Sequence, residues 1–81
     1  TGMMFDLLLP KKGGEFGGIN VNSNEYDRQA ARAMLMAINN HPLFKVAYCN
    51  DDDLINEDLC GFASGHDNHI HFQISPPTRR Q

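Results

Sequence analysis

The sequence predicts a small α+β fold in which three short strands accompany one main helix. Three segments have the length and the apolar or alternating character of strands: residues 3–9, 44–49 and about 68–75. From Glu25 to about Asn40, apolar residues instead recur at helical spacing. The chain has 81 residues, and so short a chain buries only about 60% of its unfolded surface. We therefore expect at most one domain.

The first predicted strand, from Met3 to Leu9, is apolar except for Asp6, and Pro10 ends it. A short apolar run of this kind indicates a largely buried strand. Because a buried carboxylate without a partner costs several kcal/mol, Asp6 should face a cation, a set of hydrogen-bond donors or a metal ion. The alternative is an edge position at which the carboxylate of Asp6 points into water.

The main helix is predicted to follow a flexible glycine-rich loop, Lys11 to Gly18, and to have Ser23 or Asn24 as its N-cap. It should end near Asn39 or Asn40, because Pro42 disfavours the α conformation at the residue before it. Its apolar side would consist of Tyr26, Ala30, Ala33, Met34, Ala37 and Ile38.

The second predicted strand, Phe44 to Cys49, contains the β-branched and aromatic residues that favour strands. The acidic segment after it, residues 50–59, predicts a turn and a short acidic helix. Asp51, Asp52 and Asp53 could bind calcium. No glycine or distal glutamate stands at the spacing of an EF-hand, however, so a solvated turn is the favoured interpretation.

The two cysteines, Cys49 and Cys60, are far enough apart to close a short loop if they pair. A disulfide would fit an oxidising compartment. Free cysteine, however, is also among the residue types that are most often buried. The sequence alone leaves both possibilities open.

The charge and the hydropathy argue against two classes of partner. The net charge is -3, and no basic stripe occurs beyond Arg79 and Arg80, which argues against nucleic acid. No apolar run approaches the roughly 18 to 20 residues that span a bilayer, so we expect no membrane span. Residues 76–81 are expected to form a flexible tail.

Three of the four histidines fall within six positions, at the start of the last predicted strand. Because successive strand residues point to opposite faces, this strand has an apolar face and a polar face. The apolar face carries Ile70, Phe72 and Ile74, and the polar face carries His69, His71 and Gln73. We expect the apolar face to hold the strand in the core.

The imidazoles of His69 and His71 belong to residues about 7 Å apart at Cα, close enough to address one metal ion and its bound water. A pair of solvated histidines on an exposed sheet is the alternative. The nearby His66 and the carboxylate of Asp6 favour a metal site, since zinc accepts imidazole nitrogen and carboxylate oxygen. Only Asp6 and one of the two strand histidines are convincing ligands, so one ligand is lacking.

The segment HDNHIH, His66 to His71, resembles the H-x-x-H-x-H signature of the penicillin-insensitive murein endopeptidases. These zinc peptidases belong to the LAS group, which shares a small antiparallel-sheet fold with D-Ala-D-Ala peptidases and the hedgehog signalling domain. The family's other motif is H-x-x-G-x-x-x-D, which supplies two zinc ligands. The segment TGMMFD fits its second half, with Gly2 as the glycine and Asp6 as the aspartate. The histidine of that motif would lie two positions before Thr1.

The resemblance implies a zinc-dependent peptidoglycan endopeptidase, which hydrolyses peptide cross-links with water activated by Zn2+. Asp6 and His71 would bind the zinc ion. His69 would act on the metal-bound water or the transition state, and His66 would support the site or contact the substrate. The substrate would be the peptide stems of peptidoglycan.

The resemblance also implies that residues 1–75 are the C-terminal part of a zinc peptidase catalytic domain with the LAS-type fold. An N-terminal fragment of the same protein would then supply the third zinc ligand. The location would be periplasmic or secreted, and it includes delivery into the periplasm of a target cell. Phe72 and Gln73 stand where the family often carries Val and Arg, so the bond that is cleaved stays open.

Two alternative functions compete with this one. The lysostaphin-like metallopeptidases have a final H-x-H-F motif that resembles HIHF here, but they are nearly all β, and the predicted helix argues against them. The other alternative is a noncatalytic module on the same fold that binds peptidoglycan or a protein. A histidine two positions before Thr1 would favour the enzyme, and another residue there would favour the binding module.

Overall fold

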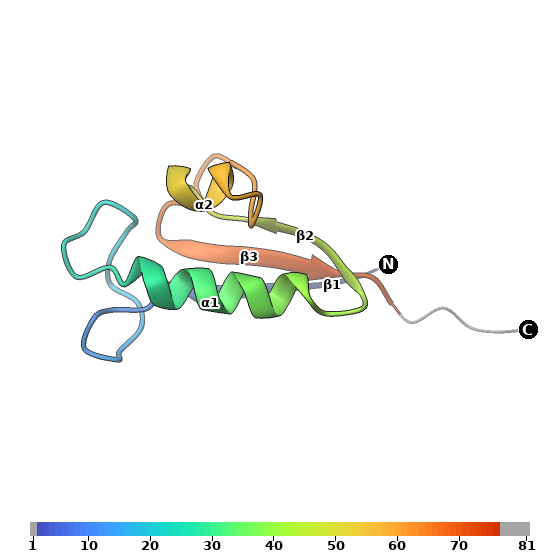
Figure 1. Cartoon of the computed structure of the whole chain (residues 1–81), viewed down its shortest axis with the longest axis horizontal. Helices are drawn as coiled ribbons and strands as arrows, with labels where there is room; N and C mark the ends of the chain where they lie inside the picture. Colours follow the sequence, from blue (N-terminus) through green and yellow to red (C-terminus); the bar gives the residue numbers. More distant parts are fainter. Residues whose placement is uncertain (1, 77–81) are drawn as a thin grey trace, which may run out of the picture.

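A computed structural model describes residues 2–76 as a three-stranded antiparallel sheet with two helices. The strands are β1 (Met3–Leu8), β2 (Phe44–Tyr48) and β3 (His69–Ile74), and the helices are α1 (Arg28–Asn39) and α2 (Asp52–Asn56). Figure 1 shows α1 running along the sheet and α2 beside the end of β2. The α+β class, the small antiparallel sheet and the one main helix are therefore confirmed. Of the predicted tail, residues 76–81, all but Pro76 lie outside the described residues.

Strand β3 lies in the centre of the sheet, in the order β1-β3-β2. Its residues Ile70 and Ile74 are buried, as the alternation predicts. Ile70 belongs to one core cluster with the α1 residues Ala31 and Leu35, so the apolar face of β3 is the face towards α1. The remaining members of this cluster are Leu9, Tyr26, Ala47, Cys49 and Leu54. The polar face of β3 is consequently directed away from the core.

The prediction that β1 is largely buried is wrong. Met3, Met4, Phe5 and Leu8 are between 40% and 67% exposed, and the side chain of Asp6 is 67% exposed. The reason is topological: among the described residues 2–76, β1 is an edge strand that pairs with β3 alone. The alternative interpretation of Asp6, an edge position with the carboxylate reaching water, is therefore the correct one.

The helix begins later than its periodicity predicts. Its N-cap is Asp27, whose side chain accepts a hydrogen bond from the backbone N–H of Ala30 (3.0 Å), and neither Ser23 nor Asn24 has this role. Tyr26, placed on the helix by its spacing, instead forms a β-bridge with Lys11. The extended backbone that this bridge requires delays the helix, although the predicted end at Asn39 is confirmed.

Asp51 is buried, with 2% of its surface exposed, which corrects the prediction of a fully solvated acidic turn. Its carboxylate accepts hydrogen bonds from the Tyr26 hydroxyl (2.7 Å) and from Nε of Arg28 (2.8 Å). It also accepts a hydrogen bond from the backbone N–H of Asp53 (3.0 Å) and so caps α2. The predicted short acidic helix after β2 is therefore confirmed. This single side chain joins the start of α1 to the start of α2.

Opposing effects set the pKa of Asp51. Its burial raises the pKa, whereas the hydrogen bonds from Tyr26 and Arg28 lower it, and the net result is a pKa below the ordinary value of 3.8. The same environment shifts the pKa of the Tyr26 phenol in the opposite direction. Burial and the adjacent carboxylate raise the pKa of Tyr26 well above its ordinary range. Asp51 is therefore ionised and Tyr26 protonated in the folded protein at neutral pH.

No helix within residues 2–76 is long and apolar enough to cross a membrane.

Asp51→Ala should lower the free energy of unfolding by about 2 kcal/mol, because the buried Tyr26 hydroxyl and the half-buried Arg28 lose a charged partner. Asp52→Ala is the matched control, since it removes a neighbouring exposed carboxylate and should cost only about 0.5 kcal/mol. Urea unfolding followed by circular dichroism measures both values. Equal losses in the two variants would contradict the bridging role of Asp51.

Asp51 should also make stability depend on pH in the acid range. Because its pKa is lower in the folded protein than in the unfolded chain, its stabilisation is fully present above the ordinary value of 3.8. It should be lost as the pH falls further, through the folded-state pKa. Thermal unfolding between about pH 5 and pH 2 should therefore show a smaller decline for Asp51→Asn than for the wild type. A decline of the same size would show that other carboxylates carry the effect.

Candidate functional site

The four residues predicted for the site gather on the sheet face that is directed away from α1. Asp6 of β1 stands directly opposite His71 of β3, and Leu8 stands opposite His69. His66 belongs to the loop that leads into β3. Residues 65 positions apart in the chain thus become neighbours because β1 and β3 pair in this register.

Asp6 and His71 are in direct contact. Oδ1 of Asp6 lies 2.8 Å from Nδ1 of His71, a hydrogen-bond distance in which the ring nitrogen donates to the carboxylate. This bond lowers the pKa of Asp6 below 3.8, against a smaller opposing effect of desolvation and with further help from the nearby imidazoles. Although Asp6 is mostly exposed, only 16% of the His71 side chain is. The imidazole is thus the more firmly held partner.

His69 faces the same carboxylate through its other ring nitrogen. Its Nε2 lies 3.9 Å from Oδ1 of Asp6, and its Nδ1 lies 2.8 Å from Oδ1 of Asn68. Because an amide oxygen can only accept, the contact with Asn68 places a proton on Nδ1 of His69. The other ring nitrogen, Nε2, is directed at the carboxylate of Asp6.

His66 packs against both strand histidines. The centroid of its ring lies 4.7 Å from that of His69 and 5.6 Å from that of His71. Its backbone is tied down by the hydrogen bond from the N–H of Asn50 to the carbonyl of His66 (3.1 Å). The preceding Gly65 has φ of +83°, a conformation that a residue with a side chain rarely adopts, and this sharp turn brings His66 back over the sheet.

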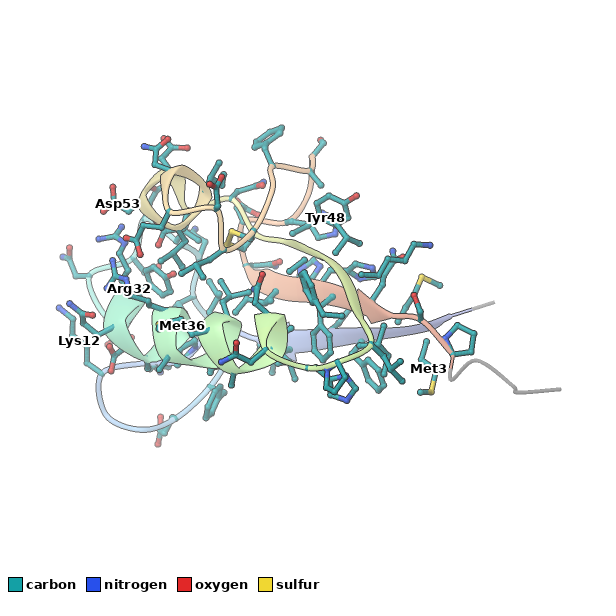
Figure 2. All side chains as sticks on the ribbon, turned by 45° about the vertical axis from the view of Figure 1, so that its right-hand side comes forward. Met3, Lys12, Arg32, Met36, Tyr48 and Asp53 are labelled. Carbon is teal, nitrogen blue, oxygen red and sulfur yellow. A yellow bond between two sulfur atoms is a disulfide. The ribbon has the colours of Figure 1, made fainter. Side chains whose placement is uncertain are left out.

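Three further residues of the site received no role from the sequence. Tyr48 of β2 stands opposite His71, and the two rings stack with their centroids 6.1 Å apart; Figure 2 labels Tyr48. Gln73 contacts His71 as well, and Asn68 holds His69. Strand alternation places Gln73 on the polar face, but Tyr48 could be found only from the pairing of β2 with β3.

The donors fit part of a zinc centre. A carboxylate oxygen and an imidazole nitrogen are ligands that zinc accepts, and those of Asp6 and His71 already meet on an accessible face. Within residues 2–76, no three His, Cys, Asp or Glu side chains are arranged so that they could hold a metal ion.

Cys49 and Cys60 form a disulfide, with their Cα atoms 5.9 Å apart, which settles the alternative that the sequence left open. Figure 2 shows this sulfur pair between α2 and the sheet. Cys49 directly follows Tyr48, and Asn50, the donor to His66, comes next. The bond therefore anchors the segment that supports two of the aromatic rings in the site.

A search against protein-family models, curated proteins and solved structures gave no significant match for this chain.

Replacing both cysteines by serine should lower the free energy of unfolding by roughly 2–3 kcal/mol, the value that chain entropy predicts for a loop of this length. The ring resonances of His66 and Tyr48 should shift more than that of His41, which lies at the far end of α1. Denaturant titration measures the first effect, and NMR of the histidine and tyrosine rings measures the second. Unchanged His66 resonances would contradict the supporting role of the disulfide.

Proposed function

We propose that this chain belongs to a zinc-dependent endopeptidase that hydrolyses the peptide cross-links of peptidoglycan. The observation that carries the proposal is the cross-strand contact between Asp6 and His71 (2.8 Å), with His69 directed at the same carboxylate oxygen. The motif H-x-x-H-x-H and the G-x-x-x-D half-motif meet here in one place. Two solvated histidines on an exposed face would need neither the carboxylate nor the ordered Asn68 contact.

In this proposal Asp6 and His71 hold the zinc ion. When bound, zinc lowers the pKa of a coordinated water to about 7 and polarises the scissile carbonyl. His69 serves as the proton acceptor, because Asn68 keeps the proton on Nδ1 and leaves the lone pair of Nε2 facing the centre. The ring of His66, which is tilted against that of His69 and edge-on to that of His71, lies where it can support them or contact the substrate.

The proposal requires a third protein ligand, a histidine two positions before Thr1 in a preceding segment of the same protein. Such a segment would run directly into β1. The exposed apolar side chains of Met3, Met4 and Phe5 give it a surface to cover. This fragment, with the LAS-type fold that it would complete, is part of the proposal.

The proposed location is the cell envelope, either periplasmic or secreted, since peptidoglycan lies there. The disulfide between Cys49 and Cys60 is compatible with such an oxidising compartment. The helix α1 disfavours the lysostaphin-like alternative, because those enzymes are nearly all β. A noncatalytic module that binds peptidoglycan or a protein stays the main competitor.

In the full-length protein, His71→Ala should abolish stoichiometric zinc binding, because it removes a ligand. His69→Ala should keep the zinc but lower the rate of cross-link cleavage by at least about 100-fold, the usual contribution of a general base. Elemental analysis after dialysis gives the metal content, and chromatography of the released peptides from purified peptidoglycan gives the rate. His41→Ala is the control, since His41 is exposed and lies outside the site.

A wild-type protein without zinc, or undiminished cleavage by His71→Ala, would refute the proposal. Bound zinc together with intact peptidoglycan would instead indicate the noncatalytic module. A residue other than histidine two positions before Thr1 would point the same way.

A further inference from the structure

Gln73 is the residue next to His71 on the polar face of β3. It stands opposite Met4 of β1 and Val46 of β2, so it lies between two apolar neighbours in the sheet. Its side-chain amide nitrogen, Nε2, lies 3.1 Å from Nε2 of His71. Both ring nitrogens of His71 are therefore engaged, Nδ1 by Asp6 and Nε2 by Gln73.

The two contacts agree on one protonation state of the ring. The ionised carboxylate of Asp6 can only accept, so Nδ1 of His71 carries the proton. Nε2 of the neutral ring is then an acceptor, and the amide N–H of Gln73 donates to it. The metal-free ring is held in its Nδ1–H form from both sides.

Zinc binding at the nitrogen that faces Asp6 would require the opposite form. Nδ1 must give up its proton to act as a ligand, and the neutral ring then carries a proton on Nε2. That proton needs an acceptor, because ligating histidines nearly always donate from their other nitrogen. An amide can supply one: a half-turn about its last torsion exchanges N–H for oxygen with almost no change in shape. An arginine could only donate, and a carboxylate could only accept.

We propose that Gln73 is a positioning residue that holds the His71 ring in both states, donating to Nε2 without metal and accepting from Nε2–H with metal. This inference rests on the proposed zinc site. Gln73 stands where the resembling family often carries Arg. The amide at this position would keep the His71 ring ordered in the metal-free protein.

The test compares two substitutions in the full-length protein, with zinc alone as the probe. Gln73→Met keeps the length of the side chain but can neither donate nor accept, and it should weaken zinc binding by about 10- to 100-fold. Gln73→Glu keeps an acceptor and should bind zinc at least as tightly as the wild type. Gln29→Met is the matched control, since it makes the same change on the exposed side of α1 and should leave the affinity unaltered. Competition with a chelator measures the affinities.

Nitrogen NMR of the wild type supplies a second readout that does not depend on activity. Without metal, a coupling across the hydrogen bond should join the Gln73 side-chain nitrogen to Nε2 of His71, and zinc should replace it with an Nε2–H signal. Absence of the coupling in the metal-free protein would overturn the inference. Equal zinc affinity of Gln73→Met and wild type would also overturn it. Failure of the wild type to bind zinc would instead remove the proposed function, and the coupling alone would then decide whether Gln73 positions His71.

Discussion

The alternation of side chains along β3 is the constraint on which the rest of the structure depends. The strand is central in the sheet, so its register with β1 and β2 is set on both sides. Burial of Ile70 and Ile74 against the helix leaves no choice for the residues between them. A slip of one position would send two imidazoles into the core and two isoleucines into water. Both changes would destabilise the fold, the first because polar rings would be buried without partners and the second because apolar burial would be lost. Burial of the apolar face of β3 thus determines that His69, His71 and Gln73 lie together on the opposite face.

A second organising feature is Asp51, whose carboxylate connects the starts of the two helices. A charge with so little exposure is tolerated because three donors surround it, two of them from side chains. Its neighbour in the chain, Asn50, donates to His66. The stability of this junction and the order of the histidine loop are therefore not independent properties.

Much of the secondary structure could be predicted from the sequence, because the local periodicity of apolar residues determines it. The strand and helix types, the faces of β3 and the end of α1 follow from spacing and proline. The start of α1 could not be predicted, because Tyr26 is withdrawn from the helix by a bridge to Lys11 that is remote in sequence. Apolar composition alone also could not reveal that β1 is an edge strand. The contacts of Tyr48 with His71 and of Asn68 with His69 could be identified only from the sheet order and the side-chain geometry.

The position of Asp6 on β1 has a consequence that concerns colloidal behaviour. Asp6 is the one charged residue in the run Met3–Leu8, and within residues 2–76 one edge of this strand has no strand partner. Exposed apolar edges act as templates for other chains, and a single carboxylate in such a run works as a gatekeeper against aggregation. One side chain thus both accepts the hydrogen bond from His71 and opposes pairing of the strand edge with other chains. A substitution that removes the charge of Asp6 therefore changes both the contact with His71 and the tendency to self-associate. The aggregation state of such a variant must be measured before any other effect is assigned to the lost contact.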